Sequence, residues 1–355
     1  MLLLAGLLGM VALGASAFVG VSDDEGDEGR AEVETPDDEA QDQADMEAAD
    51  SLLTYIGFES AEPSDNDTSA EDGADDATPP DDERIAIGTA GDDLMEGTDA
   101  RDVANGYEGA DLLSGGAAAD QLRGGPGDDT LTGDAGNDTL HGDAGNDLIV
   151  GDEGDDRLYG HSGADVVFGR DGDDSLVGGA GDDTLEGGEG DDTLHGGLGN
   201  DHLRGGLGHD VVFGGWGDDT ISGLVDDPDT DGWDDIDVMD FLNGGGGDDI
   251  ITAGASDIVT TGAGADTVIL GNWLSAEHQA EILDFEPDED TIMVVYDDTS
   301  GAEPEVDLAE DAEDAGIMRV TLNGVPIAAV NNASGLNAGH ITVIGTSLLE
   351  VGLRP

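Results

Sequence analysis

The sequence predicts an all-β fold, a parallel β-roll in which short strands and turns coil into a solenoid with two sheets. Two observations predict it. Aspartate recurs at every ninth residue from Asp93 to Asp219, and each nonad reads Gly-x-x-Gly-x-Asp-x-apolar-x. The segments 178–186 (GGAGDDTLE) and 187–195 (GGEGDDTLH) are clean copies. So short a repeat is typical of a solenoid, because one unit cannot bury its apolar side chain alone.

The composition narrows the possible ligands. The chain has 355 residues, and its 86 acidic and 9 basic residues give a formal charge of −77. Such a surface repels nucleic acids and anionic membranes and attracts cations. The absence of Cys excludes disulfides and thiolate metal sites. Abundant carboxylate without sulfur favours hard cations, and Ca²⁺ above all.

Each nonad suggests a strand followed by a turn. We expect the three residues x-apolar-x to form a short strand that points one side chain inward. The six residues Gly-Gly-x-Gly-x-Asp then form the turn. Because a strand and a turn reverse the chain, two nonads complete one coil of eighteen residues. Stacked coils give two parallel sheets with the eighth-position side chains between them. This core is thin, so the stack needs another source of stability.

The turns can supply that stability by binding ions. Glycine lets backbone carbonyls converge, and the aspartate adds a carboxylate. Ca²⁺ takes six to eight oxygens at about 2.3–2.6 Å, which two stacked turns can offer together. The coil assigns the metal-ligating aspartates to two edges, with roughly thirteen sites if each gap holds one ion. The first edge carries Asp93, Asp111, Asp129, Asp147, Asp165, Asp183, Asp201 and Asp219, and the second carries Asp102, Asp120, Asp138, Asp156, Asp174, Asp192 and Asp210.

The period is interrupted once and then resumes. An insertion at 223–243 follows the uninterrupted block. Asp240, Asp249, Asp257 and Asp266 continue the metal-ligating series, with one residue deleted between Asp249 and Asp257. Within the insertion, 227–232 (DPDTDG) matches the first six positions of an EF-hand loop, although Val238 stands where that loop needs Glu. This segment forms either an extra Ca²⁺ loop or a plain acidic excursion.

Four regions follow along the chain. Residues 1–21 are apolar and uncharged, and form either a signal peptide, cleaved after 15–17 (ASA), or an uncleaved membrane anchor. Residues 22–84 form an acidic disordered linker. Its apolar island 52–58 (LLTYIGF) is either a docking motif or a segment without a partner. The β-roll covers 85–269, and a β-rich cap covers 270–355.

The cap contains apolar, β-branched runs separated by turns. We expect strands at 291–296, 317–322, 325–330 and 341–344, with a turn at Asn323-Gly324. The acidic stretch 297–314 is expected to form a mobile loop. The cap would cover the last core layer of the solenoid.

The nonad resembles the calcium-binding repeats of RTX proteins, the hemolysin-type secreted proteins of bacteria. This resemblance covers 88–269 and implies a parallel β-roll, Ca²⁺ in the turns, and a type I secretion system as partner. The segment 282–285 (ILDF), with Asp290-Thr291-Ile292, is similar to one that follows such repeats in serralysin-type proteins. The N-terminal apolar segment departs from the family, because type I substrates usually carry an uncleaved C-terminal signal.

Two nonads on the second edge depart from the motif. They carry Ala100 and Ala118 where the fourth position is otherwise Gly. We therefore expect a weak or empty site between Asp102 and Asp120, and a looser N-terminal end.

The sequence favours a non-enzymatic protein. It contains no HExxH motif, nucleophile elbow or phosphate loop. We expect a secreted or surface-tethered bacterial calcium-binding protein, structural or adhesive, whose repeats fold on Ca²⁺ outside the cell. It would not bind nucleic acid, and would meet a membrane only through an uncleaved 1–21. The alternatives are a secreted hydrolase of the RTX type, which needs a catalytic domain, a non-catalytic remnant of such a hydrolase or toxin family, and a pore-forming toxin, which needs further membrane segments.

Overall fold

The computed structural model describes residues 84–225, 235–298, 301, 303–311, 314, 316–331 and 333–346. The predicted signal peptide or anchor, the linker up to residue 83 with its apolar island, and the EF-hand-like segment 227–232 lie outside these residues. Among the residues that it does describe, no helix has the length and apolar character needed to cross a membrane.

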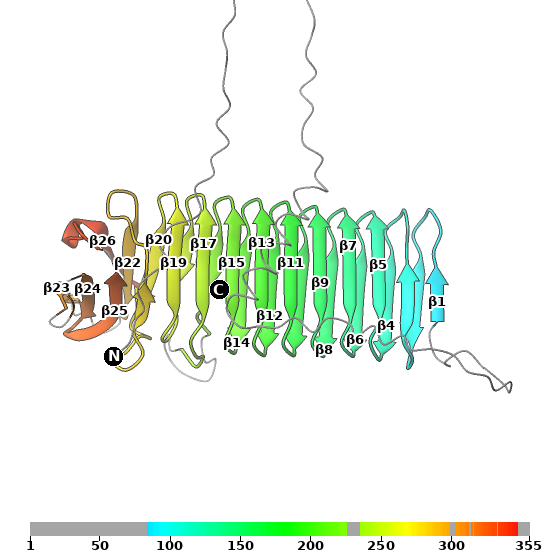
Figure 1. The fold of residues 1–355 in the computed structure, drawn as a ribbon, viewed down its shortest axis with the longest axis horizontal. Coiled ribbons are helices and arrows are strands. Elements are labelled where there is room, and N and C mark those ends of the chain that lie inside the picture. The colour runs from blue at the N-terminus through cyan, green and yellow to red at the C-terminus, as the bar shows by residue number, and fades with distance from the viewer. Residues whose placement is uncertain are drawn as a thin grey trace, which may run out of the picture. The chain divides into compact units, whose positions relative to one another are not determined.

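Two sheets run the length of the described solenoid (Figure 1). The first has fourteen strands in the order β1-β3-β5-β7-β9-β11-β13-β15-β17-β19-β21-β25-β24-β23. Their bounds are β1 (Arg84–Ile87), β3 (Asp102–Asn105), β5 (Gln121–Pro126), β7 (Thr139–Ala144), β9 (Arg157–Ser162), β11 (Ser175–Ala180), β13 (Thr193–Leu198), β15 (Val211–Trp216), β17 (Phe241–Gly246), β19 (Ile258–Ala263), β21 (Ala280–Ile282), β25 (Val325–Asn331), β24 (Ile317–Leu322) and β23 (Val306–Glu310).

The second sheet has twelve strands in the order β2-β4-β6-β8-β10-β12-β14-β16-β18-β20-β22-β26. Their bounds are β2 (Leu94–Thr98), β4 (Leu112–Ala117), β6 (Thr130–Ala135), β8 (Leu148–Glu153), β10 (Val166–Asp171), β12 (Thr184–Glu189), β14 (His202–Leu207), β16 (Thr220–Ser222), β18 (Ile250–Thr252), β20 (Thr267–Gly271), β22 (Thr291–Tyr296) and β26 (Ile341–Gly345). A short 3₁₀ turn, η1 (Ala338–His340), precedes β26.

The eighteen-residue coil is confirmed by the register of the sheets. Strand β10 pairs with β12 in parallel, with Val166 opposite Thr184. In the other sheet, β11 pairs with β13 in the same way, with Ser175 opposite Thr193. Through the roll, from β1 to β22, odd strands therefore stack on odd strands and even on even. The all-β parallel roll predicted from the nonad is the observed fold.

The expected lengths of strand and turn were wrong. We expected three-residue strands and six-residue turns, but most repeat strands, such as β12 (Thr184–Glu189), have six residues. The glycines that we placed in the turn continue the strand, since Gly188 pairs with Arg170 of the neighbouring coil. Gly188 does so at a φ of +134°, which an L side chain rarely adopts. Only Gly-x-Asp remains as the turn.

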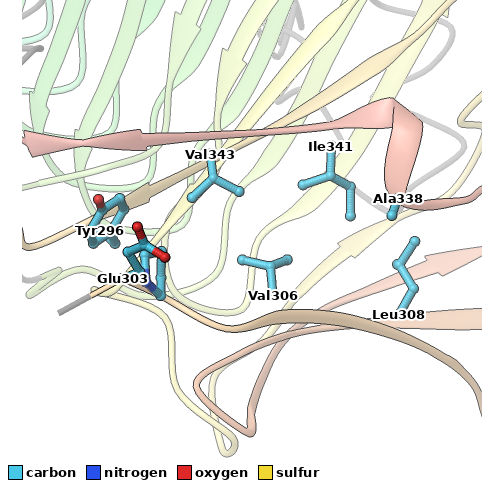
Figure 2. Close-up of a pocket in the computed structure, with 8 residues that line it drawn as sticks. Tyr296, Glu303, Val306, Leu308, Ala338, Ile341 and Val343 are labelled. Atoms are coloured by element: carbon cyan, nitrogen blue, oxygen red, sulfur yellow. The ribbon is translucent and has the colours of Figure 1, made fainter.

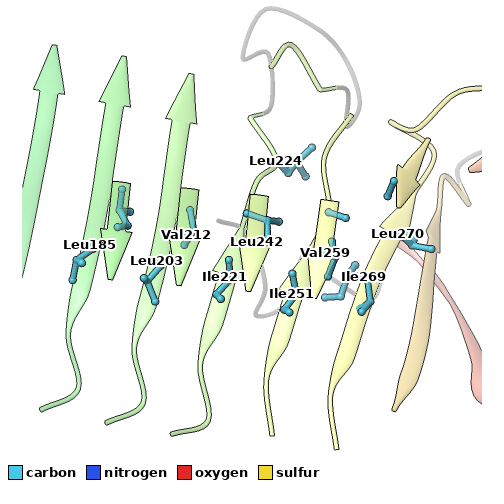
Figure 3. Packing of buried hydrophobic residues seen from close by; sticks show 14 of the residues in the cluster. Leu185, Leu203, Val212, Ile221, Leu224, Leu242, Ile251, Val259, Ile269 and Leu270 are labelled. Atoms are coloured by element: carbon cyan, nitrogen blue, oxygen red, sulfur yellow. The ribbon is translucent and has the colours of Figure 1, made fainter. Parts of the chain in front are cut away.

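The core is a double row of eighth-position side chains, as the repeat predicted. Leu185 and Leu203 come from one sheet, Val212 and Leu242 from the other, and all are at most 2% exposed. Figure 3 shows these rows facing one another between the sheets. At the N-terminal end the row weakens to Ala104 and the partly buried Met95. Each coil thus contributes two apolar side chains to the core.

The C-terminal residues extend both sheets. The four strands expected there are confirmed as β22, β24, β25 and β26, and Asn323-Gly324 turns β24 into β25 at φ of +54° and +80°. The stretch 297–314 is not a loop throughout, because Val306–Glu310 forms β23 and pairs antiparallel with β24. Val306 and Leu308 lie partly buried against the core, which explains why this part is ordered into a strand.

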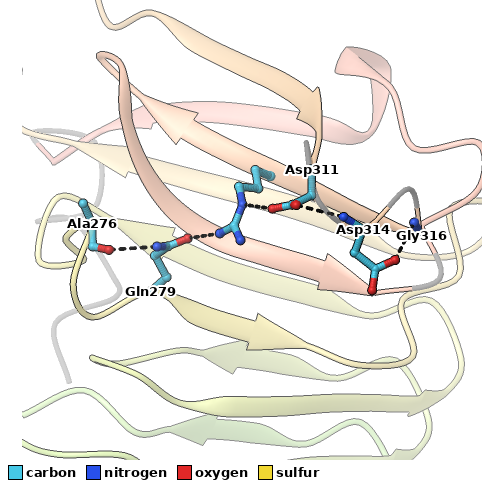
Figure 4. Close-up of polar contacts among 6 residues, drawn as sticks. Ala276, Gln279, Asp311, Asp314 and Gly316 are labelled. Carbon is cyan, nitrogen blue, oxygen red and sulfur yellow. Dashed lines mark hydrogen bonds and ion pairs between the residues drawn. The ribbon is translucent and has the colours of Figure 1, made fainter. Parts of the chain in front are cut away.

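One arginine joins loops of the cap. Arg319 of β24 donates from Nε to Asp311 at 2.5 Å and from Nη1 to Gln279 Oε1 at 2.7 Å (Figure 4). At the far end the two sheets part, leaving a groove between β23 and β26 (Figure 2). Its lining is mostly apolar and comprises Tyr296, Glu303, Pro304, Val306, Leu308, Ala338, Ile341 and Val343.

Candidate metal centre

The sixth-position aspartates form two hydrogen-bonded ladders. The Asp174 N–H donates to Asp192 Oδ1 of the next coil at 2.8 Å, and the same bond recurs from coil to coil. One ladder passes through Asp93, Asp111, Asp129, Asp147, Asp165, Asp183, Asp201, Asp219, Asp249, Asp266 and Asp290. The other passes through Asp102, Asp120, Asp138, Asp156, Asp174, Asp192, Asp210, Asp240 and Asp257.

The second carboxylate oxygen in each interior turn is buried without a hydrogen-bond partner. The aspartates themselves are at most 4% exposed. Burying an ionised carboxylate without a partner is costly, so each such oxygen needs a cation or a proton. The unpartnered atoms are Oδ2 of Asp111, Asp129, Asp147, Asp165, Asp183, Asp201, Asp219, Asp249 and Asp266 on one edge, and of Asp120, Asp138, Asp156, Asp174, Asp192, Asp210 and Asp240 on the other. At the start of the second edge, Oδ1 of Asp102 is also buried without a partner.

Burial raises the pKa of these carboxyl groups. It raises the pKa of Asp183 to about 8, aided by the charges of Asp201 and Asp165, although the hydrogen bond from the Asp165 N–H lowers it. The pKa of Asp192 rises to about 8 and that of Asp138 to about 7, again chiefly through burial. The carboxyl groups of the ladder are therefore more easily protonated than a free aspartate unless a cation lies beside them.

First-position glycines leave room beside these oxygens. A Cβ on Gly187 would collide with Oδ2 of Asp192 and with the carbonyl oxygen of Gly205 in the next coil. A Cβ on Gly181, at the fourth position, would collide with the Gly163 carbonyl oxygen. Glycine is favoured at both positions because oxygens of stacked turns converge there, as the sequence argument proposed, although Ala occupies the fourth position in two nonads.

Fifth-position side chains form a further, exposed ladder that we did not foresee. Asp191 Oδ1 accepts from the His209 N–H at 2.9 Å, and Asn146 Oδ1 accepts from the Ala164 N–H at 2.8 Å. These bonds run in the opposite direction along the stack to those of the sixth position. Asn and Asp serve equally well here, because one neutral acceptor oxygen is sufficient. Where the fifth position is Asp or Asn, its Oδ1 thus has a structural role, because it joins neighbouring coils.

The first two turns differ from the rest. The Thr98 N–H donates to Asp102 Oδ2 at 2.6 Å, and the Thr89 N–H donates to Asp93 Oδ2 at 2.6 Å. In both turns threonine replaces the left-handed second residue, so both edges are altered at their start. Ala118 adopts a φ of +72° like the glycines. The weak site between Asp102 and Asp120 stays a prediction, with Thr98 rather than Ala118 as its physical basis.

The ladders also end in hydrogen-bonded carboxylates. Asp257 Oδ2 accepts from the Gly254 N–H at 2.6 Å. The first edge extends one turn beyond the predicted series to Asp290, which accepts from the Asp266 N–H at 3.2 Å and, on Oδ2, from the Glu286 N–H at 2.7 Å. The run Asp290-Thr291-Ile292 has the Asp-x-apolar pattern of the repeat, which was a signal for this turn. Asp290 follows Asp266 by twenty-four residues instead of eighteen, so the period did not reveal it.

The chemistry of the donor set fits calcium. The two edges present rows of carboxylate and carbonyl oxygens, with the carboxylates buried and half of their oxygens unpartnered. All-oxygen sets of this kind suit hard cations such as Ca²⁺ rather than zinc or copper, which prefer imidazole and thiolate ligands.

Comparison with protein families gives one result that agrees with this chemistry. The model of the RTX calcium-binding nonapeptide repeat matches at 87–122, 114–149, 123–158, 141–176, 150–185, 168–203, 195–227, 239–268 and 254–272. A search of curated proteins gave no match. Through residues 87–272, the chain belongs to the family of RTX calcium-binding nonapeptide-repeat proteins, whose repeats bind multiple Ca²⁺ ions.

Proposed function

We propose that this protein is secreted or surface-tethered, that its β-roll folds when Ca²⁺ binds outside the cell, and that the folded roll has a structural or adhesive role. The rows of buried, unpartnered Oδ2 atoms carry the proposal. An anionic oxygen without a donor destabilises the metal-free roll, whereas the same oxygen binds a cation well. Binding free energy therefore becomes folding free energy.

The ligands in this proposal are the sixth-position aspartates with unpartnered oxygens, together with carbonyl oxygens of the turns. Asp93, Asp102 and Asp257 belong to the same series, but their Oδ2 atoms already accept hydrogen bonds. Asp93 and Asp257 would contribute least, whereas Asp102 keeps a buried, unpartnered Oδ1. The division of the chain into an export segment, a linker, a roll and a cap belongs to the same proposal.

The location follows from the calcium concentration that such sites require. Extracellular calcium modules bind with Kd of about 10⁻⁴–10⁻³ M, far above free cytosolic calcium. The chain would therefore stay unfolded inside the cell and fold on exit. Family membership supports a type I secretion system as the export partner, and the apolar segment 1–21 supports a membrane route or anchor.

A non-catalytic role is part of the proposal. A β-roll built from repeats alone is typically a binding module or scaffold, and the aspartate pairs follow the repeat rather than a reacting geometry. A hydrolase of the RTX type would need a catalytic domain, and the strands described here are all used by the roll and its cap.

Calcium should fold the purified chain. We expect a gain of β circular dichroism between micromolar and millimolar free Ca²⁺, because ions neutralise the buried oxygens. A titration in calcium buffers measures it, with Mg²⁺ at the same ionic strength as control. A chain that is fully folded in excess EGTA would refute the proposal.

Replacing one ladder carboxylate should have opposite effects with and without calcium. Asp192→Asn removes a buried charge, so we expect greater stability than wild type in EGTA. In excess calcium it loses a ligand, and the local calcium affinity should fall at least about tenfold. Urea unfolding and calcium titration measure both.

The matched control for this variant is Asp191→Asn, at the exposed fifth position. It keeps the oxygen that accepts from the His209 N–H, so stability should change by less than about 0.5 kcal/mol. Equal effects of the two substitutions would show that the sixth position has no special role.

Acid should stabilise the metal-free roll. The folded pKa values of Asp183 and Asp192 are about 8, well above the ordinary 3.8, so the folded chain binds more protons than the unfolded chain between about pH 4 and 8. Stability in EGTA should therefore rise as the pH is lowered through this window, and be lost as the pH rises. In excess Ca²⁺ the sign should reverse, since protons compete for the same oxygens. Urea unfolding along a pH series tests both signs, and metal-free stability that increases with pH would contradict the assignment.

Fractionation tests the location. We expect the protein in the medium or at the cell surface, and N-terminal sequencing of the mature chain should distinguish a cleaved from a retained 1–21. Recovery of the chain only from the cytosol, with 1–21 intact, would overturn secretion while leaving calcium binding untouched.

A further inference from the structure

The insertion rebuilds one turn of the second edge without glycine. In register, the six residues that end at Asp240 are 235–240 (DIDVMD), where other turns read Gly-Gly-x-Gly-x-Asp. The Asp210 N–H still donates to Asp240 Oδ1 at 2.9 Å, across thirty residues instead of eighteen. The ladder is thus preserved although the oxygens around it come from different groups.

The side chain of Asp237 stands where other turns present a backbone carbonyl. In regular turns a fourth-position N–H donates to the third-position carbonyl of the next coil, as Gly190 does to Leu207 at 2.8 Å. Gly208 occupies the same position, but its N–H donates to Asp237 Oδ1 at 2.8 Å. A carboxylate oxygen therefore replaces a carbonyl oxygen, and the second oxygen of Asp237 is buried without a partner.

Three carboxylates meet at this point. Asp210, Asp237 and Asp240 each offer an oxygen, and these atoms all lie within 4.8 Å of one another. A Ca²⁺ ion at its usual ligand distance spans oxygens up to about 5 Å apart. Asp210 and Asp240 are 1% exposed, and both Oδ2 atoms lack a hydrogen-bond donor. Among the residues that the structure describes, this is the one group of three or more His, Cys, Asp or Glu side chains whose ligand atoms lie so close together.

The neck of the insertion holds Asp237 in place. Asp235 Oδ1 accepts from the N–H groups of Asp237 at 3.3 Å and Val225 at 3.2 Å, and the Ile236 N–H donates to the Val225 carbonyl at 3.1 Å. Leu224, in the same neck, is buried in the core beside Leu242 (Figure 3). These contacts fix the loop ends, so less ordering is needed when an ion binds.

We infer that Asp210, Asp237 and Asp240 form a calcium site that the insertion creates, and that this site is the tightest on the roll and fills first. Ligand charge helps to set the affinity of oxygen sites for Ca²⁺, and the carboxylate of Asp237 adds a negative charge where regular turns present a neutral carbonyl oxygen. The inference rests on the proposed calcium-dependent function. It makes the insertion the starting point for ordering the coils on either side of it.

Asp237→Asn separates this site from a purely structural role. Asparagine keeps an oxygen for the Gly208 N–H but removes the anionic ligand. The experiment is equilibrium dialysis of the full chain against radioactive calcium in calcium buffers. We expect wild type to bind one ion more tightly than the rest, and Asp237→Asn to weaken that ion at least about tenfold while the remaining sites are unchanged.

Asp191→Asn is the matched control, because it removes one charge from the same edge one coil away and keeps its hydrogen bond to His209. It should leave the tight ion unchanged. An unchanged tight ion in Asp237→Asn, or an equal weakening in both variants, would overturn the inference. Circular dichroism in excess calcium verifies that each variant folds.

Hydrogen exchange of the wild type gives a test that does not depend on a variant. The amides of Gly208 and Asp210 should gain protection at lower free calcium than those of distant coils. Simultaneous protection of all coils would overturn the inference while leaving the proposed function intact. A wild-type chain that binds no calcium would instead refute the proposed function itself.

Discussion

The main constraint on the roll is that its buried carboxylates have too few hydrogen-bond donors. Each interior sixth-position aspartate uses Oδ1 to accept from the next coil and leaves Oδ2 with no donor. Backbone pairing and two apolar side chains per coil cannot offset a row of buried charges. Each such oxygen therefore needs a cation or a proton, and the same need explains why glycine occupies the first position of each regular turn, where a Cβ would fill the space beside Oδ2.

The fifth and sixth positions show how the repeat separates structure from ligation. The sixth position is always Asp, whereas most fifth positions are Asp or Asn, whose side-chain oxygen accepts from a backbone N–H of a neighbouring coil in much of the roll. Only the fifth tolerates other residues: Asn146 and Asn200 each accept from the next coil, and Ala164 has no side-chain acceptor at all, because this position is exposed. The sixth is Asp in every nonad because its second oxygen faces a buried space in which a neutral amide would place donors instead of charge.

Much of the fold was predictable because the repeat length alone sets the register of the strands. A period of nine and a coil of two nonads fix which strands pair, which aspartates share an edge, and which side chain points inward. What the sequence could not reveal depends on local φ and on the insertion. The conformation of the second residue in a turn decides whether Oδ2 of that turn's aspartate has a donor. Thr98 donates its N–H to Oδ2 of Asp102, whereas Gly188, at a positive φ, leaves Oδ2 of Asp192 without a donor. Asp237 enters the ladder only through a loop closed by Asp235, which no spacing predicts.

The ends of the ladders show where ions are needed. An ion that links two coils requires a turn on each side, so a terminal turn has no neighbour with which to share it. At these turns the chain supplies donors instead: Thr89 and Thr98 at the start, Gly254 and Glu286 at the finish. The unpartnered Oδ2 atoms of the ladders are confined to the turns between them. The Oδ2 atoms at the ends are thus matched by donors, while the interior Oδ2 atoms, and Oδ1 of Asp102, still need a proton or an ion, because a buried carboxylate oxygen must be matched by one or the other.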